Sequence, residues 1–374
     1  MSPRTASADP SELRVLVVDD SAVNRRSISN MLSGAPHMTV VGKAANGEEA
    51  LRMVRVCEPD VITLDLEMPK MDGFTFLRIV MAKTPLPVIV VSSYSQHENV
   101  FKALELGALD FVAKPDLLRP GDDSIQSELL SKLAIVRGEL LLQRPRRRQP
   151  VSFSSLTRAS RGARPPSKLV VIAASTGGPS ALLEVLAQLP ATTDLAILVA
   201  QHMPEKFTRT FAERLHRGSN LVVREAEHDE LIRGGEVLVC PGMRCLEVAR
   251  VGDRLRTRVM PPAASDRFFP SADRLFASAA KACPNRCIGV VLTGMADDGT
   301  KGSVALAQAG GYIMSESEET AVVYGMPRAV QEAGVVHEQL PLYEIPQALL
   351  KLEHVSLSQW ARVRRGDRSK LGMD

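Results

Sequence analysis

The chain lacks the long apolar segments of membrane proteins. No hydrophobic stretch in its 374 residues approaches the length that spans a bilayer. Its polar beginning, MSPRTASADPSELR, also lacks the apolar region of a signal peptide. We therefore expect a soluble, cytoplasmic protein without membrane insertion, whose 45% of hydrophobic residues suffice for two domains with separate cores.

Aromatic residues, net charge and cysteines are scarce as well. One Trp, four Tyr and a net charge of +3 offer neither a stacking surface nor a strong field for nucleic acid. The cysteines are odd in number and show no CxxC spacing, which argues against a disulfide framework and against a zinc site. We interpret them as small buried thiols. They are Cys57, Cys240, Cys245, Cys283 and Cys287.

The first half of the chain alternates apolar, β-branched runs with segments of helical period. Five such units predict a doubly wound parallel sheet with helices on both faces. The expected strands are 14–18, 38–42, 60–65, 87–92 and 109–114, and the last expected helix is 124–142.

A second alternating series begins at Lys168 and again predicts an α/β domain with a mostly parallel sheet. Residues 252–260, which follow LEVAR, favour one arm of an inserted hairpin. The expected strands are 168–175, 195–202, 237–241 and 288–294.

Between the two series the chain is rich in Arg, Pro and Ser, a composition typical of a linker. We interpret its arginines, Arg144 and Arg146–Arg148, as a solvated tether; contact with an acidic surface or nucleic acid is the alternative. The predicted division is a domain over 13–135, a linker over 136–167, a second domain over 168–355 and a charged tail over 356–374.

Acidic residues follow the strands of the first domain. Asp19 and Asp20 follow the first strand and Asp65 ends the third, so they meet at the carboxyl edge, where open α/β sheets bind ligands. Three such carboxylates repel one another unless a cation lies between them, and an all-oxygen set suits Mg²⁺ beside a phosphoryl group. Asp65 is then placed to attack phosphorus, with Ser92 and Lys114 on the phosphoryl oxygens. Helix capping is the alternative role for each aspartate.

The motifs VVDDS, LDLEMPKMDG, VVSS and FVAKP occur in this order, and with them residues 13–135 resemble the receiver domain of two-component response regulators. The resemblance implies a flavodoxin-like fold in which Asp65 is the phosphorylation site. It also implies that Asp19, Asp20, Asp65 and the backbone of Glu67 hold Mg²⁺, and that Phe111 occupies the aromatic switch position.

Ser175 stands in VVIAASTGGP, where an apolar strand runs into two glycines and a proline. Gly177 and Gly178 let the backbone turn sharply, and Pro179 is favoured in the first turn of a helix. The free N–H groups of that helix suit a phosphate, but the GxxxxGK[ST] pattern of a P-loop is absent. The other interpretation is a nucleophile, which needs a base and a group that orients the base.

A candidate base and a candidate orienting group are both available at the same edge of the sheet as Ser175. His202 ends the next strand, and Asp297 and Asp298 follow a later one. With one of the two aspartates they form a plausible Ser-His-Asp arrangement, although a lone histidine at a strand end is more often structural. Chain order and the AASTGG turn differ from the α/β-hydrolases, which suggests a hydrolase that arose by convergence on a different sheet.

Main-chain N–H groups near Thr176 and Met295 are expected to receive the oxyanion of such a reaction. The loss of one donor of this kind typically costs about 3 kcal/mol of transition-state stabilisation.

The motifs ASTGGP, QHMP, LTGMADDG, PSAD and YGMPRA, behind a receiver, make the chain similar nearly end to end to the chemotaxis methylesterases of the CheB family. The resemblance implies a Rossmann-like catalytic domain with Ser175, His202 and Asp298 as its triad. It implies hydrolysis of glutamate methyl esters on the cytoplasmic helices of chemoreceptors, with release of methanol, and deamidation of selected receptor glutamines. It further implies a chemotaxis histidine kinase as phosphodonor and an unphosphorylated receiver that blocks the catalytic cleft. We expect a monomer that needs no cofactor for the ester reaction.

Four residues depart from the family's pattern. Ala173 and Ala296 stand where the family usually has glycine, and Cys240 and Cys245 replace an alanine and a histidine. The substituted cysteine loop leaves one alternative open, a catalytically weak, phosphorylation-controlled scaffold in a non-flagellar chemosensory pathway. The other alternative is a transcriptional regulator, but the βα alternation after Lys168 leaves no room for a helix-turn-helix.

Overall fold

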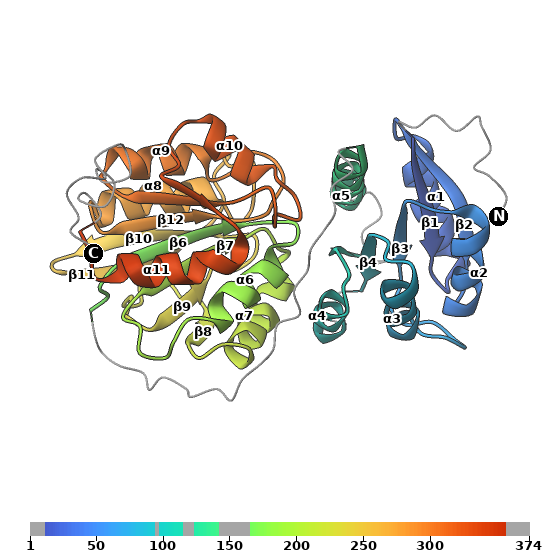
Figure 1. Ribbon diagram of the computed structural model, residues 1–374, viewed down its shortest axis with the longest axis horizontal. Helices are drawn as coiled ribbons and strands as arrows, with labels where there is room; N and C mark the ends of the chain where they lie inside the picture. Colours follow the sequence, from blue (N-terminus) through green and yellow to red (C-terminus); the bar gives the residue numbers. More distant parts are fainter. Residues whose placement is uncertain (1–11, 94–96, 115–122, 142–164, 357–374) are drawn as a thin grey trace, which may run out of the picture. The chain divides into compact units, whose positions relative to one another are not determined.

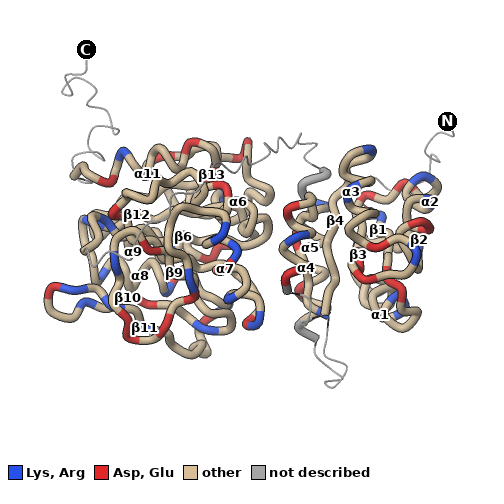
Figure 2. Tube along the Cα trace, turned by 90° about the horizontal axis from the view of Figure 1, so that it is seen from below, with Lys and Arg blue, Asp and Glu red and all other residues tan. Residues whose placement is uncertain are grey.

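The computed structural model describes residues 12–93, 97–114, 123–141 and 165–356. The chain divides into two compact units, Met1–Pro145 and Arg146–Asp374. Most of the predicted linker, with its arginines, and nearly all of the predicted tail lie outside the described residues. Acidic and basic positions are interspersed along both units (Figure 2). None of the helices in the described part is long and apolar enough to cross a membrane.

The first unit is a five-stranded parallel sheet in the order β2-β1-β3-β4-β5. Helices α1 and α5 lie on one face, and α2, α3 and α4 lie on the other (Figure 1). The predicted doubly wound sheet is therefore confirmed. The strands are β1 (Leu13–Val18), β2 (Met38–Ala44), β3 (Val61–Leu64), β4 (Val88–Ser92) and β5 (Asp110–Ala113). The helices are α1 (Ala22–Ser33), α2 (Gly47–Cys57), α3 (Gly73–Lys83), α4 (His97–Glu105) and α5 (Asp123–Leu141).

Polar residues at the carboxyl edge of this sheet start the helices that follow. Strands β3, β4 and β5 are buried along their whole length, because helices cover both faces. Ser21, Asn46 and Asp72 cap helices α1, α2 and α3 by accepting a hydrogen bond from a backbone N–H of the first turn. Asp19, Asp20 and Asp65 are not among these caps, so the capping alternative fails for them.

The second unit contains a seven-stranded parallel sheet in the order β14-β13-β12-β6-β7-β9-β8. Helices α8, α9 and α10 cover one face, and α6, α7 and α11 cover the other (Figure 1). The strands are β6 (Leu169–Ala174), β7 (Ala196–Gln201), β8 (Val222–Glu225), β9 (Glu236–Val239), β12 (Cys287–Val291), β13 (Tyr312–Glu316) and β14 (Glu338–Leu340). The α-helices are α6 (Gly178–Ala187), α7 (Thr208–Arg217), α8 (Ala272–Ala282), α9 (Thr300–Gln308), α10 (Met326–Glu332) and α11 (Ile345–Glu353). Short 3₁₀ helices are η2 (Glu205–Phe207) and η3 (Leu342–Glu344).

The predicted hairpin is also present. Strands β10 (Cys245–Val251) and β11 (Arg254–Met260) pair antiparallel in a separate two-stranded sheet. The four expected strands of the parallel sheet are β6, β7, β9 and β12, whereas β8, β13 and β14 had not been expected. Two of these three, β8 and β14, are the short edge strands, and both carry charged residues.

The central strand β6 lies between β7 and β12. Ala174 pairs with Gln201 of β7, and Ala173 pairs with Val291 of β12. Because all three strands are parallel, the residues that follow them meet at one edge of the sheet.

Candidate active site

The turn after β6 presents Ser175 and requires two glycines. Gly177 has φ +79°, a conformation that disfavours side chains, and a Cβ there would lie 2.7 Å from the Val322 side chain. A Cβ on Gly178 would lie 2.1 Å from Oε1 of Gln201. Pro179 follows in the first turn of α6, as the sequence predicted.

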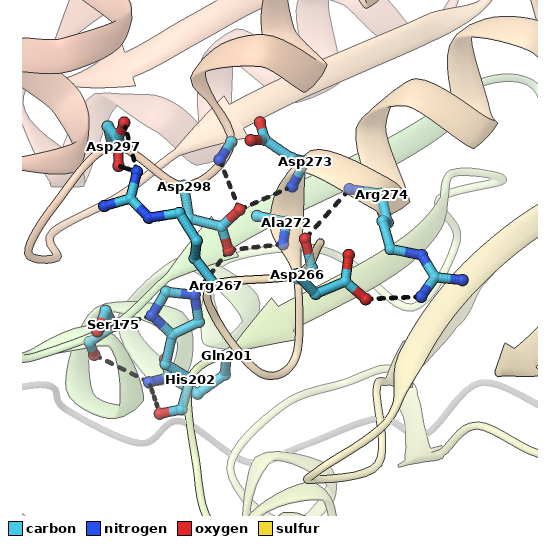
Figure 3. Close-up of polar contacts among 12 residues, drawn as sticks. Ser175, Gln201, His202, Asp266, Arg267, Ala272, Asp273, Arg274, Asp297 and Asp298 are labelled. Atoms are coloured by element: carbon cyan, nitrogen blue, oxygen red, sulfur yellow. Dashed lines mark hydrogen bonds and ion pairs between the residues drawn. The ribbon is translucent and has the colours of Figure 1, made fainter. Parts of the chain in front are cut away.

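His202 lies between Ser175 and Asp298 (Figure 3). Its Nδ1 is 3.2 Å from Oγ of Ser175, and its Nε2 is 2.8 Å from Oδ2 of Asp298. A proton on Nε2 is donated to the carboxylate, which leaves Nδ1 to accept the hydroxyl proton. Nε2 of Gln201 donates to the carbonyl oxygens of Ser175 and His202, at 2.9 and 3.0 Å, and so fixes both backbones.

Asp298 is held at the N-terminus of helix α8. Its carboxylate accepts hydrogen bonds from the backbone N–H groups of Ala272 at 2.8 Å, Asp273 at 3.0 Å and Gly299 at 3.0 Å. Burial raises the pKa of this carboxyl, but the hydrogen bond and charge of His202, together with the backbone donors, lower it further than burial raises it. Asp298 therefore stays ionised beside the imidazole.

Asp297 points away from the histidine (Figure 3). Its half-exposed side chain pairs with Arg267 at 3.4 Å. Of the two aspartates that the sequence left open, Asp298 is thus the one in contact with His202.

Two further side chains near the triad had not been foreseen. The ring of Phe268 stacks on the imidazole of His202, with ring centroids 5.3 Å apart and an interplanar angle of 9°. The guanidinium of Arg267 lies 5.2 Å from the centroid of the same phenyl ring. Both residues belong to the segment between β11 and α8, which has no periodic pattern that would place it over the site.

The expected oxyanion donors lie on two turns that contact each other. Ser175 N–H donates to the carbonyl oxygen of Thr293 at 3.0 Å, and a Cβ on Gly294 would lie 2.9 Å from Cβ of Ser175. Among the described residues, the backbone N–H groups of Thr176 and Met295 have no hydrogen-bond acceptor. Unpaired backbone N–H groups are the kind of donor that binds a developing negative charge in acyl transfer, so the oxyanion role stays a prediction for these two.

The first unit brings its three carboxylates together. Oxygen atoms of Asp19, Asp20 and Asp65 all lie within 4.8 Å of one another. Nζ of Lys114 is 2.6 Å from Oδ2 of Asp65 and 2.9 Å from Oδ2 of Asp19. An all-oxygen set of this kind, with Asp20 exposed beside two buried members, fits a hydrated Mg²⁺.

Burial raises the pKa of Asp65, and the neighbouring charge of Asp19 adds to that effect. Lys114 and the backbone N–H of Leu66 act in the opposite direction without cancelling it. Burial would lower the pKa of Lys114, but its contacts with Asp65 and Asp19 raise it, so the ammonium stays charged.

The remaining predicted residues of this unit differ in burial. Ser92 ends β4 and is fully buried, and Glu67 is exposed, where its Oε1 accepts from the side chain of Asn99 at 3.4 Å. Phe111 is buried in β5, and its ring packs edge-on against Phe101 with centroids 6.3 Å apart.

The cysteines are free thiols. Four of them are buried, as predicted, but Cys57 is partly exposed. Sγ of Cys240 contacts carbonyl oxygens of its own loop, and Sγ of Cys245 lies 3.6 Å from Oδ2 of Asp266, in the segment that carries Phe268. The loop that carries Cys240 and Cys245 therefore contacts the segment between β11 and α8, which carries Phe268.

Together the two units define a class of protein. A receiver-type α/β unit with an acidic cluster precedes an α/β unit with a Ser-His-Asp arrangement at its carboxyl edge. The parallel seven-stranded sheet leaves no helix-turn-helix in the described part of the second unit, so the transcriptional alternative fails.

Comparisons with known proteins identify the family. The family model described as response regulator receiver domain matches residues 15–119, and that described as CheB methylesterase matches residues 170–349. Protein-glutamate methylesterase/protein-glutamine glutaminase 6 of Anaeromyxobacter dehalogenans (strain 2CP-C) is 50% identical over 91% of this chain and 95% of its own length. The corresponding protein 1 of Myxococcus xanthus (strain DK1622) is 46% identical over 91% of this chain and 97% of its own. The crystal structure of the Thermotoga maritima CheB methylesterase catalytic domain is 38% identical and covers 50% of this chain and 98% of that one, with a TM-score of 0.49.

The family matches and the two relatives show that the chain belongs to the CheB family of protein-glutamate methylesterases/protein-glutamine glutaminases.

Proposed function

We propose that this chain is a phosphorylation-controlled hydrolase that removes methyl esters from glutamate side chains of chemoreceptors and deamidates selected receptor glutamines. The observation that carries the proposal is the contact of one imidazole, that of His202, with both Ser175 and Asp298. The relatives are named for both activities. Because the substrate helices of a chemoreceptor are cytoplasmic, we place the reaction in the cytoplasm.

The first half of the reaction transfers the acyl group to the enzyme. Oγ of Ser175 attacks the ester carbon while Nδ1 of His202 takes the hydroxyl proton. Asp298 stabilises the imidazolium that forms, and the N–H groups of Thr176 and Met295 bind the oxyanion. The imidazolium then protonates the leaving oxygen, and methanol departs.

The second half returns the enzyme to its starting state. His202 takes a proton from a water molecule, whose oxygen attacks the acyl-enzyme, and then returns a proton to Oγ of Ser175. The product is a free glutamate side chain. A glutamine follows the same route, with ammonia in place of methanol, so one triad serves both reactions. We expect a monomer, because all three side chains come from one chain.

Control is assigned to the first unit. Asp65 accepts a phosphoryl group from a chemotaxis histidine kinase, and Ser92 and Lys114 contact its oxygens. Asp19, Asp20, Asp65 and the backbone carbonyl of Glu67 would hold Mg²⁺, which neutralises charge on the transferring phosphoryl group when bound. Phe111 changes position on phosphorylation.

Methanol release from methylated receptor membranes tests the esterase. The wild-type chain is expected to release methanol, and Ser175→Ala is expected to release none above the no-enzyme control, because it removes the hydroxyl that contacts His202. Wild-type rates in Ser175→Ala would rule out this nucleophile.

The same assay with acetyl phosphate tests the control. Asp65→Asn is expected to keep basal methanol release and to lose stimulation by the phosphodonor, because the amide cannot be phosphorylated. Asp72→Asn, which changes only a capping carboxylate on the same unit, serves as the matched control. Full stimulation of Asp65→Asn would refute the assignment.

A further inference from the structure

Glu316 is a fully buried carboxyl that the proposed mechanism does not use. It ends β13, next to β12 in the sheet, and its side chain is 0% exposed. Its Oε2 accepts a hydrogen bond from the backbone N–H of Thr293 at 2.8 Å. A carboxyl buried this deeply is costly to ionise, so its presence beside the site calls for a reason.

Thr293 connects this carboxyl to both turns of the proposed oxyanion site. Its carbonyl oxygen accepts from Ser175 N–H at 3.0 Å, and its hydroxyl donates to the carbonyl oxygen of Thr176 at 2.8 Å. The same hydroxyl accepts from Val323 N–H at 2.8 Å. Gly294 and Met295 follow Thr293 directly in the chain. A shift of Thr293 would therefore move both the turn that carries Ser175 and the turn that carries Met295.

The charge on Glu316 changes near neutral pH. Burial raises the pKa of its carboxyl to about 7, against the opposing hydrogen bonds from the backbone N–H of Thr293 and the side chain of Thr320. Glu184 of α6 is the charged group that acts on it, and it raises the pKa further.

We propose that Glu316 is a positioning residue for the proposed oxyanion site, and that ionisation of its carboxyl slows the proposed hydrolysis. The inference rests on the proposed function. The neutral carboxyl holds Thr293 N–H without adding charge. The ionised carboxyl places a negative charge two hydrogen bonds from Ser175, where the oxyanion develops, and like charges repel strongly in a low-dielectric interior.

The test is methanol release by the full-length chain between pH 6 and pH 8.5, with kcat and KM determined separately. Glu316→Gln keeps an acceptor for Thr293 N–H but cannot ionise. As the pH rises through about 7, the wild-type kcat is expected to fall about fivefold relative to that of Glu316→Gln, with KM unchanged. Parallel pH profiles of the two enzymes would overturn the inference.

Glu353→Gln is the matched control. Glu353 is also buried and also accepts from a backbone N–H, that of Asp194 at 2.5 Å, but it ends α11, away from Thr293. Its variant is expected to reproduce the wild-type pH profile.

A second variant, Glu184→Gln, keeps the inference testable if Glu316→Gln does not fold. Loss of the Glu184 charge lowers the pKa of Glu316, so the decline in kcat is expected to move to lower pH. An unmoved midpoint contradicts the inference. Failure of the wild type to release methanol at any pH contradicts the proposed function instead, and the two failures are thereby distinguished.

Discussion

Asp65 and Asp298 occupy equivalent places in two different sheets. Each follows a parallel strand at its carboxyl edge, and each is buried, with 5% and 2% of its surface exposed. Their pKa values nevertheless shift in opposite directions, upward for Asp65 and downward for Asp298. The difference comes from the neighbours. Asp298 accepts three backbone N–H bonds and one from His202, whereas Asp65 has Lys114 and one backbone N–H and also faces a second carboxylate, Asp19.

The comparison shows how one sheet edge supports two kinds of chemistry. A carboxylate with all its acceptor sites filled stays ionised and fixed, which suits the orientation of a base. A carboxylate whose burial is only partly compensated, here by Lys114, gains from a bound cation and keeps an oxygen for reaction, which suits a phosphorylation site. The two aspartates thus share a position in the fold, and the hydrogen-bond donors around each one determine its chemical role.

The largest expected effect comes from the fixed carboxylate. Asp298→Asn should reduce kcat for methanol release by about 10⁴-fold, because the amide no longer stabilises the imidazolium and favours the wrong tautomer of His202. Asp297→Asn is the matched neighbour, and it should stay within about twofold of the wild type because its side chain pairs at the surface with Arg267. Comparable losses in the two variants would break the assignment of Asp298.

The same substitution should change stability in opposite directions at the two sites. At pH 7 and without Mg²⁺, Asp298→Asn should destabilise its unit by about 2 kcal/mol, because an ionised, fully bonded carboxylate is lost. Asp65→Asn should stabilise its own unit, because the variant removes a buried charge next to Asp19. Calorimetric unfolding of the full chain measures both effects.

The pH dependence of the free energy of unfolding gives the sign of each aspartate's contribution to stability. The pKa of Asp298 is lowered in the folded state, so its contribution is present above the unfolded value of about 3.9 and is lost as the pH falls toward the folded value. The pKa of Asp65 is raised, so its cost is full above the folded value and disappears below the unfolded one. Equal signs for the two variants at pH 7 would contradict the comparison.

Much of the fold and of the two candidate sites could be predicted from the sequence, because parallel strands bring the residues that follow them to one edge of the sheet. That rule placed Ser175 with His202, and Asp19 with Asp65. It could not choose between Asp297 and Asp298, since that choice depends on how the N-terminus of α8 enters the site.

The supporting contacts were beyond prediction for a similar reason. Phe268 and Glu316 act across the fold, from an irregular segment and from an unexpected strand, and no local pattern marks either residue. The motif PSAD gives no sign in the sequence of its structural role: it starts α8, whose first N–H groups bind Asp298.

The smallest expected effect concerns the turn between the proposed oxyanion donor and Asp298. Ala296 has φ +68°, a left-handed conformation that costs a residue with a Cβ about 1 kcal/mol relative to glycine. Ala296→Gly should therefore stabilise the catalytic unit by about 1 kcal/mol and leave kcat within about twofold of the wild type.

Ala173 is the matched case with the opposite expectation. It lies inside β6, it is 0% exposed, and its methyl group belongs to the core that includes Leu275 and Phe276 of α8. Ala173→Gly should destabilise the unit by about 1 kcal/mol, because it removes a buried methyl group and loosens a central strand. Thermal unfolding of both variants distinguishes the two alanines, since only Ala296 is at positive φ and strained. A gain in stability from Ala173→Gly would show that the strand, rather than the turn, carries the strain next to Ser175.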